Sequence, residues 1–169
     1  MFVTNHVYAG AIIGALCEDR AGSAFLAGFA SHIAMDAMPH WGDDTMTLHD
    51  PRFERIARRD GVLGLASLIG VAATSRGRRR AVLAGMAGAT ILDAEKPCLF
   101  FFGVNPFPAW LDRFHHWIQH EAPHRMPHEI AVGAALAALT VPFLRRRVPA
   151  ATRLRTRRSP RRRAVRAVR

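Results

Sequence analysis

Residues 31–44, SHIAMDAMPHWGDD, hold two histidines and three carboxylates directly after an apolar run rich in glycine and alanine. His32 and Asp36 are four positions apart, so on a helix they project from one face about a turn apart and can share a ligand. Pro39 lacks a backbone donor and disfavours helical geometry at the residue before it, so we predict that the helix ends there. His40 then belongs to the turn that follows.

Imidazole nitrogens and carboxylate oxygens at this spacing suit a divalent metal ion, with zinc ahead of manganese or iron. The alternative is a helix end that is polar because it meets water. For this stretch alone the two interpretations weigh equally, so the rest of the chain has to supply the deciding ligands.

The chain has 169 residues, the length of one domain, and 50% of them are hydrophobic, which suffices for a core. Its formal charge of +11 is concentrated at one end. Twelve of the 24 Lys and Arg side chains lie in residues 145–169, where no acidic residue occurs. Residues 1–144 contain the other twelve and all thirteen Asp and Glu, so their net charge is −1. We therefore expect a helical domain, residues 1–147, and a disordered Arg-rich tail, residues 148–169.

Apolar runs separated by glycine, proline and charged residues predict an all-α bundle of about five to six helices. We expect helices at 4–17, at 24–38, from Asp50 and Pro51 into the apolar run 61–74, at 81–104 with a break at Pro97, and at 129–144. The first two helices contain small residues that permit close packing, as in membranes: Gly10, Gly14, Gly22 and Gly28.

The apolar runs also predict that the bundle is embedded in a membrane, although two of them fit this poorly. Run 61–74 is shorter than the roughly 20 residues that a span needs, so it can equally be a core helix or a re-entrant segment. Run 81–104 is long enough, but it carries Asp93, Glu95 and Lys96 near its middle. Each such charge costs about 2.5–3.5 kcal/mol at a helix centre on insertion scales, unless it faces a polar interior, pairs or binds metal.

The Arg-rich tail next to an apolar helix is typical of a cytoplasmic anchor. Each basic residue near an anionic bilayer contributes about 1 kcal/mol of attraction, so we expect anionic headgroups as partners. Nucleic acid is the less favoured partner, because no aromatic side chains for base stacking lie between the arginines.

Five of the nine histidines lie within residues 115–128. His116 and His120 are four positions apart and can share a helical face, and His115 and His120 can do so if the helix is irregular. The alternative is a solvated amphipathic loop with pH-dependent charge. We favour metal binding, because a ligand-like cluster lies upstream and sites in helical bundles form between facing helices.

Three phrases, SHIAMD (31–36), GATILDAEKP (88–97) and HHWIQH (115–120), resemble motifs of a bacterial inner-membrane family, the membrane-bound metal-dependent hydrolases. The motifs depart from the family pattern in their order, at Leu92, where the family has proline, and at Glu95, where it has aspartate. The resemblance implies metal ligands at the matched positions and at an early histidine: His6, His32, Asp36, Asp93, Glu95, His115 and His120. A looser likeness to zinc-dependent phospholipase C enzymes rests on the HxxxD spacing followed by a further histidine, His40.

We therefore expect a membrane-bound metal-dependent hydrolase of the bacterial inner membrane, acting on a phosphoester or lipid. His116 adds a ligand to those above, and Asp36 or Glu121 is the expected general base. The alternative is a non-catalytic helical membrane protein with structural His–Asp pairs and a tail that binds anionic lipid or nucleic acid. No GxSxG, GxxxxGK[ST] or GxGxxG pattern occurs, so serine-hydrolase, NTPase and Rossmann functions are excluded.

Overall fold

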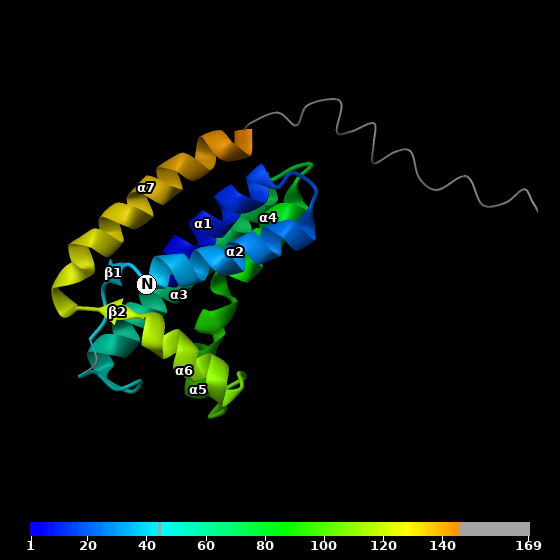
Figure 1. Ribbon diagram of the computed structural model, residues 1–169. Helices are drawn as coiled ribbons and strands as arrows, with labels where there is room; N and C mark the ends of the chain where they lie inside the picture. The colour runs from blue at the N-terminus through cyan, green and yellow to red at the C-terminus, as the bar shows by residue number, and fades with distance from the viewer. Residues whose placement is uncertain (44, 146–169) are drawn as a thin grey trace, which may run out of the picture.

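The computed structural model describes residues 1–43 and 45–145, and the predicted tail lies outside them (Figure 1). Its α-helices are α1 (Val3–Leu16), α2 (Ala21–Asp36), α3 (Pro51–Thr74), α4 (Arg79–Thr90), α5 (Glu95–Phe102), α6 (Ala109–Ile118) and α7 (Met126–Arg145). Short 3-10 helices occur at η1 (Ile91–Ala94) and η2 (Pro123–Arg125). The all-α prediction is confirmed. Because α4, η1 and α5 form one continuous run, the helices fall into six segments, as expected.

Helices α1 and α4 pack backbone to backbone through glycines. A Cβ atom on Gly10 would lie 2.5 Å from the carbonyl oxygen of Gly85, and one on Gly14 would lie 2.5 Å from that of Ala81. Real side chains do not tolerate such approaches, so any larger residue here would push the helices apart. The two glycines of α1 are four positions apart and therefore form one contact face.

Helix α2 packs on α4 in the same way. A Cβ atom on Gly28 would overlap the carbonyl group of Gly85, and one on Gly88 would overlap that of Phe25. The prediction of close packing is therefore confirmed for Gly28, as it is for the two glycines of α1. It is wrong for Gly22, which has open space at its Cβ position.

Carboxylates from two other helices hold the start of α1. Asp60 in α3 accepts hydrogen bonds from the backbone nitrogens of Val3 (2.7 Å) and Thr4 (3.2 Å), and Glu129 in α7 accepts one from the backbone nitrogen of Phe2 (3.0 Å). These donors have no partner inside the helix, and negative charge at a helix N-terminus is favourable. The N-terminal turn of α1 is thus tied to both α3 and α7.

Helix α3 begins as its sequence predicts. The side chain of Asp50 accepts hydrogen bonds from the backbone nitrogens of Arg52 (2.7 Å) and Phe53 (3.4 Å), and Pro51 occupies the first helical position. The helix then continues without interruption to Thr74, so its polar and apolar halves form one element.

The predicted break near Pro97 occurs slightly upstream of the proline. Pro97 has no N–H to donate to the carbonyl group of Asp93, four residues earlier, and the chain forms a 3-10 helix over Ile91–Ala94. The proline itself is tolerated because it lies in the first turn of α5. This irregular turn carries Asp93 to the ends of α1 and α2.

The segment after α2 and the segment after α6 meet in a small sheet. Strands β1 (Pro39–His40) and β2 (His120–Glu121) pair in parallel, with Pro39 opposite His120 and His40 opposite Glu121. The two histidine-rich stretches of the sequence therefore lie side by side, as predicted (Figure 1).

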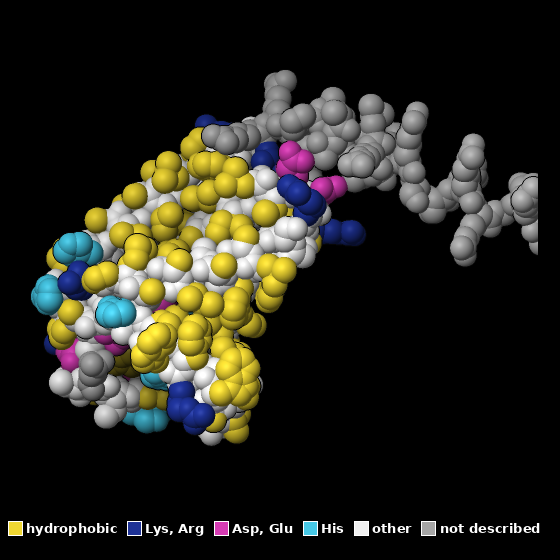
Figure 2. All heavy atoms as spheres, in the orientation of Figure 1, with side chains coloured by type: hydrophobic (Ala, Val, Ile, Leu, Met, Phe, Trp, Pro, Cys, Tyr) yellow, Lys and Arg dark blue, Asp and Glu magenta, His cyan; other side chains and the backbone are white. Residues whose placement is uncertain are grey.

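Large apolar side chains cover much of the molecular surface (Figure 2). Exposed examples on the α5–α6 hairpin are Phe101, Phe102, Val104, Trp110 and Trp117. Among the described residues, one helical stretch, Pro123–Arg145, is long and apolar enough to cross a membrane by length and composition. It lies along the outside of α1 and is mostly exposed (Figure 1).

The glycine contacts predict a large effect of one methyl group. Gly85→Ala should lower the free energy of unfolding by about 1–3 kcal/mol, because its Cβ would overlap the backbone of α1. Gly70→Ala in α3 is the matched control: nothing lies within 4 Å of its Cβ position, so the same change should raise stability by roughly 0.5–1 kcal/mol. Denaturant unfolding in detergent measures both; equal effects would contradict the packing.

Candidate metal centre

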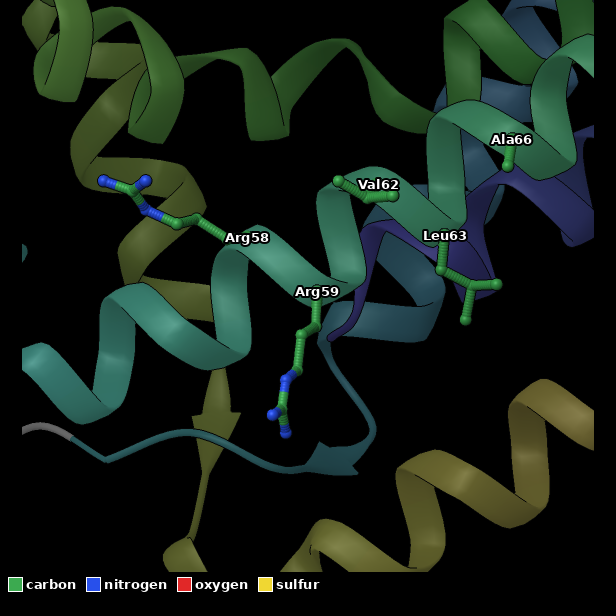
Figure 3. Close-up of a pocket in the computed structure, with 5 residues that line it drawn as sticks. All are labelled: Arg58, Arg59, Val62, Leu63 and Ala66. Carbon is green, nitrogen blue, oxygen red and sulfur yellow. The ribbon is translucent and has the colours of Figure 1, made fainter.

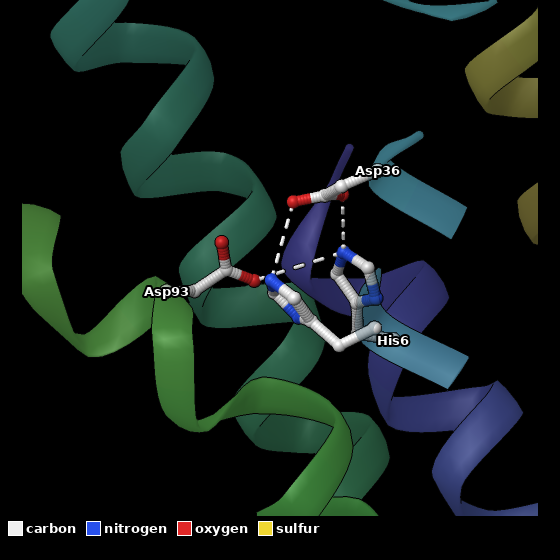
Figure 4. A group of neighbouring side chains, drawn as sticks. His6, Asp36 and Asp93 are labelled. Atoms are coloured by element: carbon white, nitrogen blue, oxygen red, sulfur yellow. Dashed lines mark hydrogen bonds and ion pairs between the residues drawn. The ribbon is translucent and has the colours of Figure 1, made fainter. Parts of the chain in front are cut away.

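Four side chains from three elements converge at the end of the three-helix contact. His6 comes from α1, His32 and Asp36 from α2, and Asp93 from η1, and one ligand atom of each lies within 4.8 Å of all the others. His6, His32 and Asp36 are fully buried, while the side chain of Asp93 is 13% exposed. The carboxylates of Asp36 and Asp93 point at the ring of His6 from different elements (Figure 4).

The glycine contacts place these ligands. His6 precedes Gly10 by four residues and His32 follows Gly28 by four residues, so each histidine lies one turn from a backbone contact and on the same face. The two imidazole rings stack with their centroids 4.2 Å apart. Gly85, Ala89 and Asp93 are likewise four residues apart along α4 and η1. The contact faces of α1, α2 and α4 therefore meet beside these ligands.

Asp36 lies at the centre of the cluster. Its Oδ1 is 3.0 Å from His6 Nε2 and 3.1 Å from the Met1 amino group, and its Oδ2 is 3.0 Å from His115 Nε2 and 3.2 Å from His32 Nε2. Burial alone would raise the pKa of Asp36, but the hydrogen bonds with His115, His32 and His6 lower it below its ordinary value. The carboxylate is therefore ionised.

The hydrogen bond of His32 to the backbone fixes its tautomer. Nδ1 lies 2.8 Å from the carbonyl oxygen of Ala89, and because a carbonyl oxygen only accepts, Nδ1 carries the proton. Nε2 lies 3.0 Å from His115 Nε2 and 3.2 Å from Asp36 Oδ2. Burial would lower the pKa of His32, but the hydrogen bond with Asp36 raises it above its ordinary value, so a proton and a cation compete for Nε2. A backbone carbonyl that orients an imidazole in this way is typical of metal-ligating histidines.

Hydrogen bonding alone does not satisfy the cluster. His6 Nδ1 and Asp93 Oδ2 are buried without a hydrogen-bond partner among the described residues. Asp93 Oδ2 is 3.9 Å from His6 Nε2, too far for a hydrogen bond. Burial lowers the pKa of His6, which favours its neutral, metal-binding form. Asp93 Oδ2 therefore has lone pairs available to a cation.

The donor set and spacing fit a divalent ion. Three imidazoles (His6, His32, His115) and two carboxylates (Asp36, Asp93) match the ligand preferences of zinc, manganese and iron. Ligands on opposite sides of an ion with bonds of about 2.0–2.2 Å lie roughly 4.0–4.4 Å apart, so the separations below 4.8 Å among His6, His32, Asp36 and Asp93 need little adjustment. His115 adjoins these four through contacts of 3.0 Å with His32 Nε2 and Asp36 Oδ2. Gln119 Nε2, 3.3 Å from Asp36 Oδ2, adds a donor that holds the central carboxylate.

Two further predicted ligands, Glu95 and His116, belong to a neighbouring group. Together with Asp112 they place ligand atoms within 4.8 Å of one another. The two groups adjoin through His115, whose Nδ1 lies 3.9 Å from Glu95 Oε2. The predicted ligands are therefore divided between two adjacent groups.

The remaining predicted residues lie in neither group. His40 is buried, its Nδ1 donates to the carbonyl oxygen of Met38 (2.8 Å), and its Nε2 is 3.7 Å from Glu121 Oε1. Burial would raise the pKa of Glu121, but the interaction with His40 lowers it. His120 is exposed and its Nδ1 donates to the carbonyl oxygen of Ile118. The structure thus gives Glu121, our expected general base, a place beside His40 rather than in the cluster.

Sequence reasoning missed Asp112, Gln119 and the supporting carboxylates Asp60 and Glu129. The i,i+4 spacing of Asp112 and His116 is a signal that could have identified the first. Gln119 lies just beyond the end of α6, so helical spacing does not predict where its side chain points. Asp60 and Glu129 contact residues more than fifty positions away, and no local pattern indicates this.

A shallow depression lies on the outer side of α3 (Figure 3). Its lining comes from one helix and consists of Arg58, Arg59, Val62, Leu63 and Ala66. None of the clustered histidines or carboxylates lines it. The candidate metal ligands and this depression are therefore separate features of the structure.

Comparison with known proteins gave no match: no family model, no curated protein and no solved structure matches this chain. The resemblance of three short motifs to membrane-bound metal-dependent hydrolases stays a prediction.

Glu129 predicts how strongly the cluster depends on its support. This buried carboxylate accepts hydrogen bonds from Phe2 N, Asn5 Nδ2 (2.8 Å) and Trp41 N (3.2 Å). Glu129→Ala leaves these donors unsatisfied and should lower the free energy of unfolding by about 3 kcal/mol or more, since each buried orphan costs about 1–3 kcal/mol.

Glu54→Ala is the control for Glu129→Ala. Glu54 forms a partly exposed ion pair with Arg58 (3.4 Å), which should contribute less than about 1 kcal/mol. Denaturant unfolding of both variants measures the difference. A Glu129→Ala protein as stable as the Glu54→Ala protein would contradict the role of Glu129 in anchoring α1.

Proposed function

We propose that this protein is a membrane-bound metal-dependent hydrolase in which His6, His32, Asp36, Asp93 and His115 hold a divalent metal, zinc first. One observation carries the proposal: His32 Nε2 and His115 Nε2 lie 3.0 Å apart beside a buried, ionised Asp36. Nδ1 of His32 donates to the backbone, so Nε2 holds either a proton shared with Asp36 and His115 or a cation. The partnerless oxygen of Asp93 favours the cation.

The residues of the cluster would have different roles in holding an ion. Asp36 interacts with three imidazoles, which suits a ligand better than the general base that its sequence also allowed. The carbonyl group of Ala89 orients His32, and Gln119 orients Asp36. Asp93 is the most exposed of the ligands, so it marks the side from which a substrate would approach.

A divalent ion in such a site lowers the pKa of a coordinated water and polarises an ester or phosphoryl oxygen. The apolar helix contacts that surround the cluster exclude bulk water and strengthen electrostatic interactions inside it. A phosphoester of a lipid is the substrate class we propose, because exposed Trp110 and Trp117 lie on the helix that carries His115 and are suited to a membrane interface.

We place the protein in the bacterial inner membrane, with the Arg-rich tail in the cytoplasm. The support is the apolar stretch Pro123–Arg145, the arginines that follow it and the exposed apolar side chains of α5 and α6.

The membrane proposal predicts the outcome of tail deletion. Protein lacking residues 148–169 should stay in the membrane fraction through a wash with high salt and be extracted only by detergent, because α7 provides the anchor. The full-length chain is the control. Release of the truncated protein by salt alone would contradict a membrane span by α7.

The second candidate is a non-catalytic helical membrane protein in which the His–Asp cluster is structural. The nearly complete burial of Asp36 and the contact of its Oδ1 with the Met1 amino group favour this alternative. It predicts a cluster that binds no metal and whose removal affects only stability.

Metal content distinguishes the two candidates. Detergent-purified protein should bind zinc, and His32→Ala or Asp36→Ala should weaken zinc binding by tenfold or more, because each removes a buried ligand. His49→Ala is the matched control, since the His49 side chain is 72% exposed and outside both groups. Binding that persists unchanged in the His32→Ala and Asp36→Ala variants, or that is absent from the wild type, would contradict the metal centre.

Activity is tested separately with a chromogenic phosphodiester in mixed micelles. Hydrolysis should disappear after chelation, return on adding zinc, and be lost in Asp36→Ala but not in His49→Ala. If the protein binds zinc but hydrolyses neither phosphoesters nor lipid esters, the metal site would be supported and the hydrolase function would be contradicted.

A further inference from the structure

The second group of ligands lies at the junction of α5 and α6. Glu95 is the first residue of α5, and Asp112 and His116 are four positions apart on α6, so they project from one face. Ligand atoms of the three residues lie within 4.8 Å of one another. Two carboxylates and one imidazole form a set that divalent cations accept.

Glu95 is largely buried, and no hydrogen bond to its side chain occurs among the described residues. Its side chain is 8% exposed, and the nitrogens that pair with it are His115 Nδ1 at 3.9 Å and His116 Nε2 at 4.0 Å. Both distances exceed hydrogen-bond range. Because the burial of a carboxylate costs less when an opposite charge binds it closely, a cation beside Glu95 would be favourable.

His116 presents a ring nitrogen to the same place. Its Nδ1 donates to the backbone carbonyl oxygen of Asp112 (3.0 Å), so Nε2, 4.0 Å from Glu95 Oε1, is the nitrogen left to bind an ion. Asp112 Oδ1 accepts a hydrogen bond from Asn105 Nδ2 (2.9 Å), which leaves the other oxygen of the carboxylate for an ion. Thus an imidazole nitrogen and a carboxylate oxygen are both available opposite Glu95.

The two groups differ in access to solvent. The side chains of His116 and Asp112 are 57% and 27% exposed, whereas those of His6 and Asp36 are fully buried. His115 lies between the groups, with Nε2 3.0 Å from Asp36 Oδ2 and Nδ1 3.9 Å from Glu95 Oε2. One imidazole therefore separates a closed group from an open one.

We infer that Glu95, Asp112 and His116 form a second divalent-cation site, adjacent to the buried centre and open to solvent. The inference rests on the proposed function and extends it: the buried ion is held permanently, and the open ion exchanges and offers free coordination positions to an anionic phosphoester oxygen. With three protein ligands and more exposure, the open site binds its ion more weakly than the buried one.

Titration of the full-length protein in detergent tests this inference. Metal-free protein is titrated with Mn²⁺ or Zn²⁺ in equilibrium dialysis. The wild type should bind two ions per chain in two affinity steps, and His116→Ala and Asp112→Asn should lose only the weaker step. His124→Ala, another exposed histidine, is the control and should keep both. Unchanged thermal unfolding of the metal-free variants would show that the lost step is not caused by misfolding.

The outcomes separate this inference from the proposed function. One ion per chain in the wild type, unchanged in His116→Ala, would overturn the second site, leave the buried centre intact and reduce Glu95 to a residue that orients His115. Two ions, both lost in Asp36→Asn and one lost in His116→Ala, would support an open site that depends on the buried one. No bound ion in the wild type would overturn both the inference and the metal centre.

Discussion

The close approach of α1, α2 and α4 at Gly85 is the constraint on which the rest of the structure depends. Helices bearing ordinary side chains pack about 8–10 Å apart, and glycines at a contact allow a closer approach of the backbones. Here the added Cβ atoms would overlap backbone, and the rings of His6 and His32 stack with centroids 4.2 Å apart, one turn from the contact. The glycines are therefore part of the site although none can bind a ligand.

Two other features complete the site around this contact. The irregular turn before Pro97 sends Asp93 and Glu95 to different groups, although they are two residues apart. Carboxylates of α3 and α7 hold the first turn of α1, so the position of His6 depends on helices that contribute no ligand. The parallel pair of β1 and β2 joins the two histidine segments and fixes α6, which carries His115, beside α2.

The sequence predicted the parts of this arrangement that are local. The spacing of His32 and Asp36 and the start of α3 at Asp50 and Pro51 follow from short-range rules. The convergence of the two histidine-rich segments was predicted from the general rule that sites in helical bundles form between facing helices. The sequence did not predict which ligands belong to the buried cluster and which to the second group, because this depends on packing between helices. His40 and His120 have the same spacing as true helical pairs, but the strand pair draws both away from the cluster. Gln119 and Asp60 act across long sequence separations that a single sequence does not reveal.

The proposed metal centre brings imidazoles and carboxylates from α1, α2, η1 and α6 onto one ion at the glycine contact. X-ray absorption spectroscopy of protein loaded with one equivalent of zinc tests it directly. We predict a shell of nitrogen and oxygen at about 2.0–2.2 Å with the outer-shell scattering of two or three imidazoles, strongly reduced in His32→Ala. A sulfur shell near 2.3 Å, which would indicate Cys17 or Cys98, or a shell without imidazole scattering would contradict it.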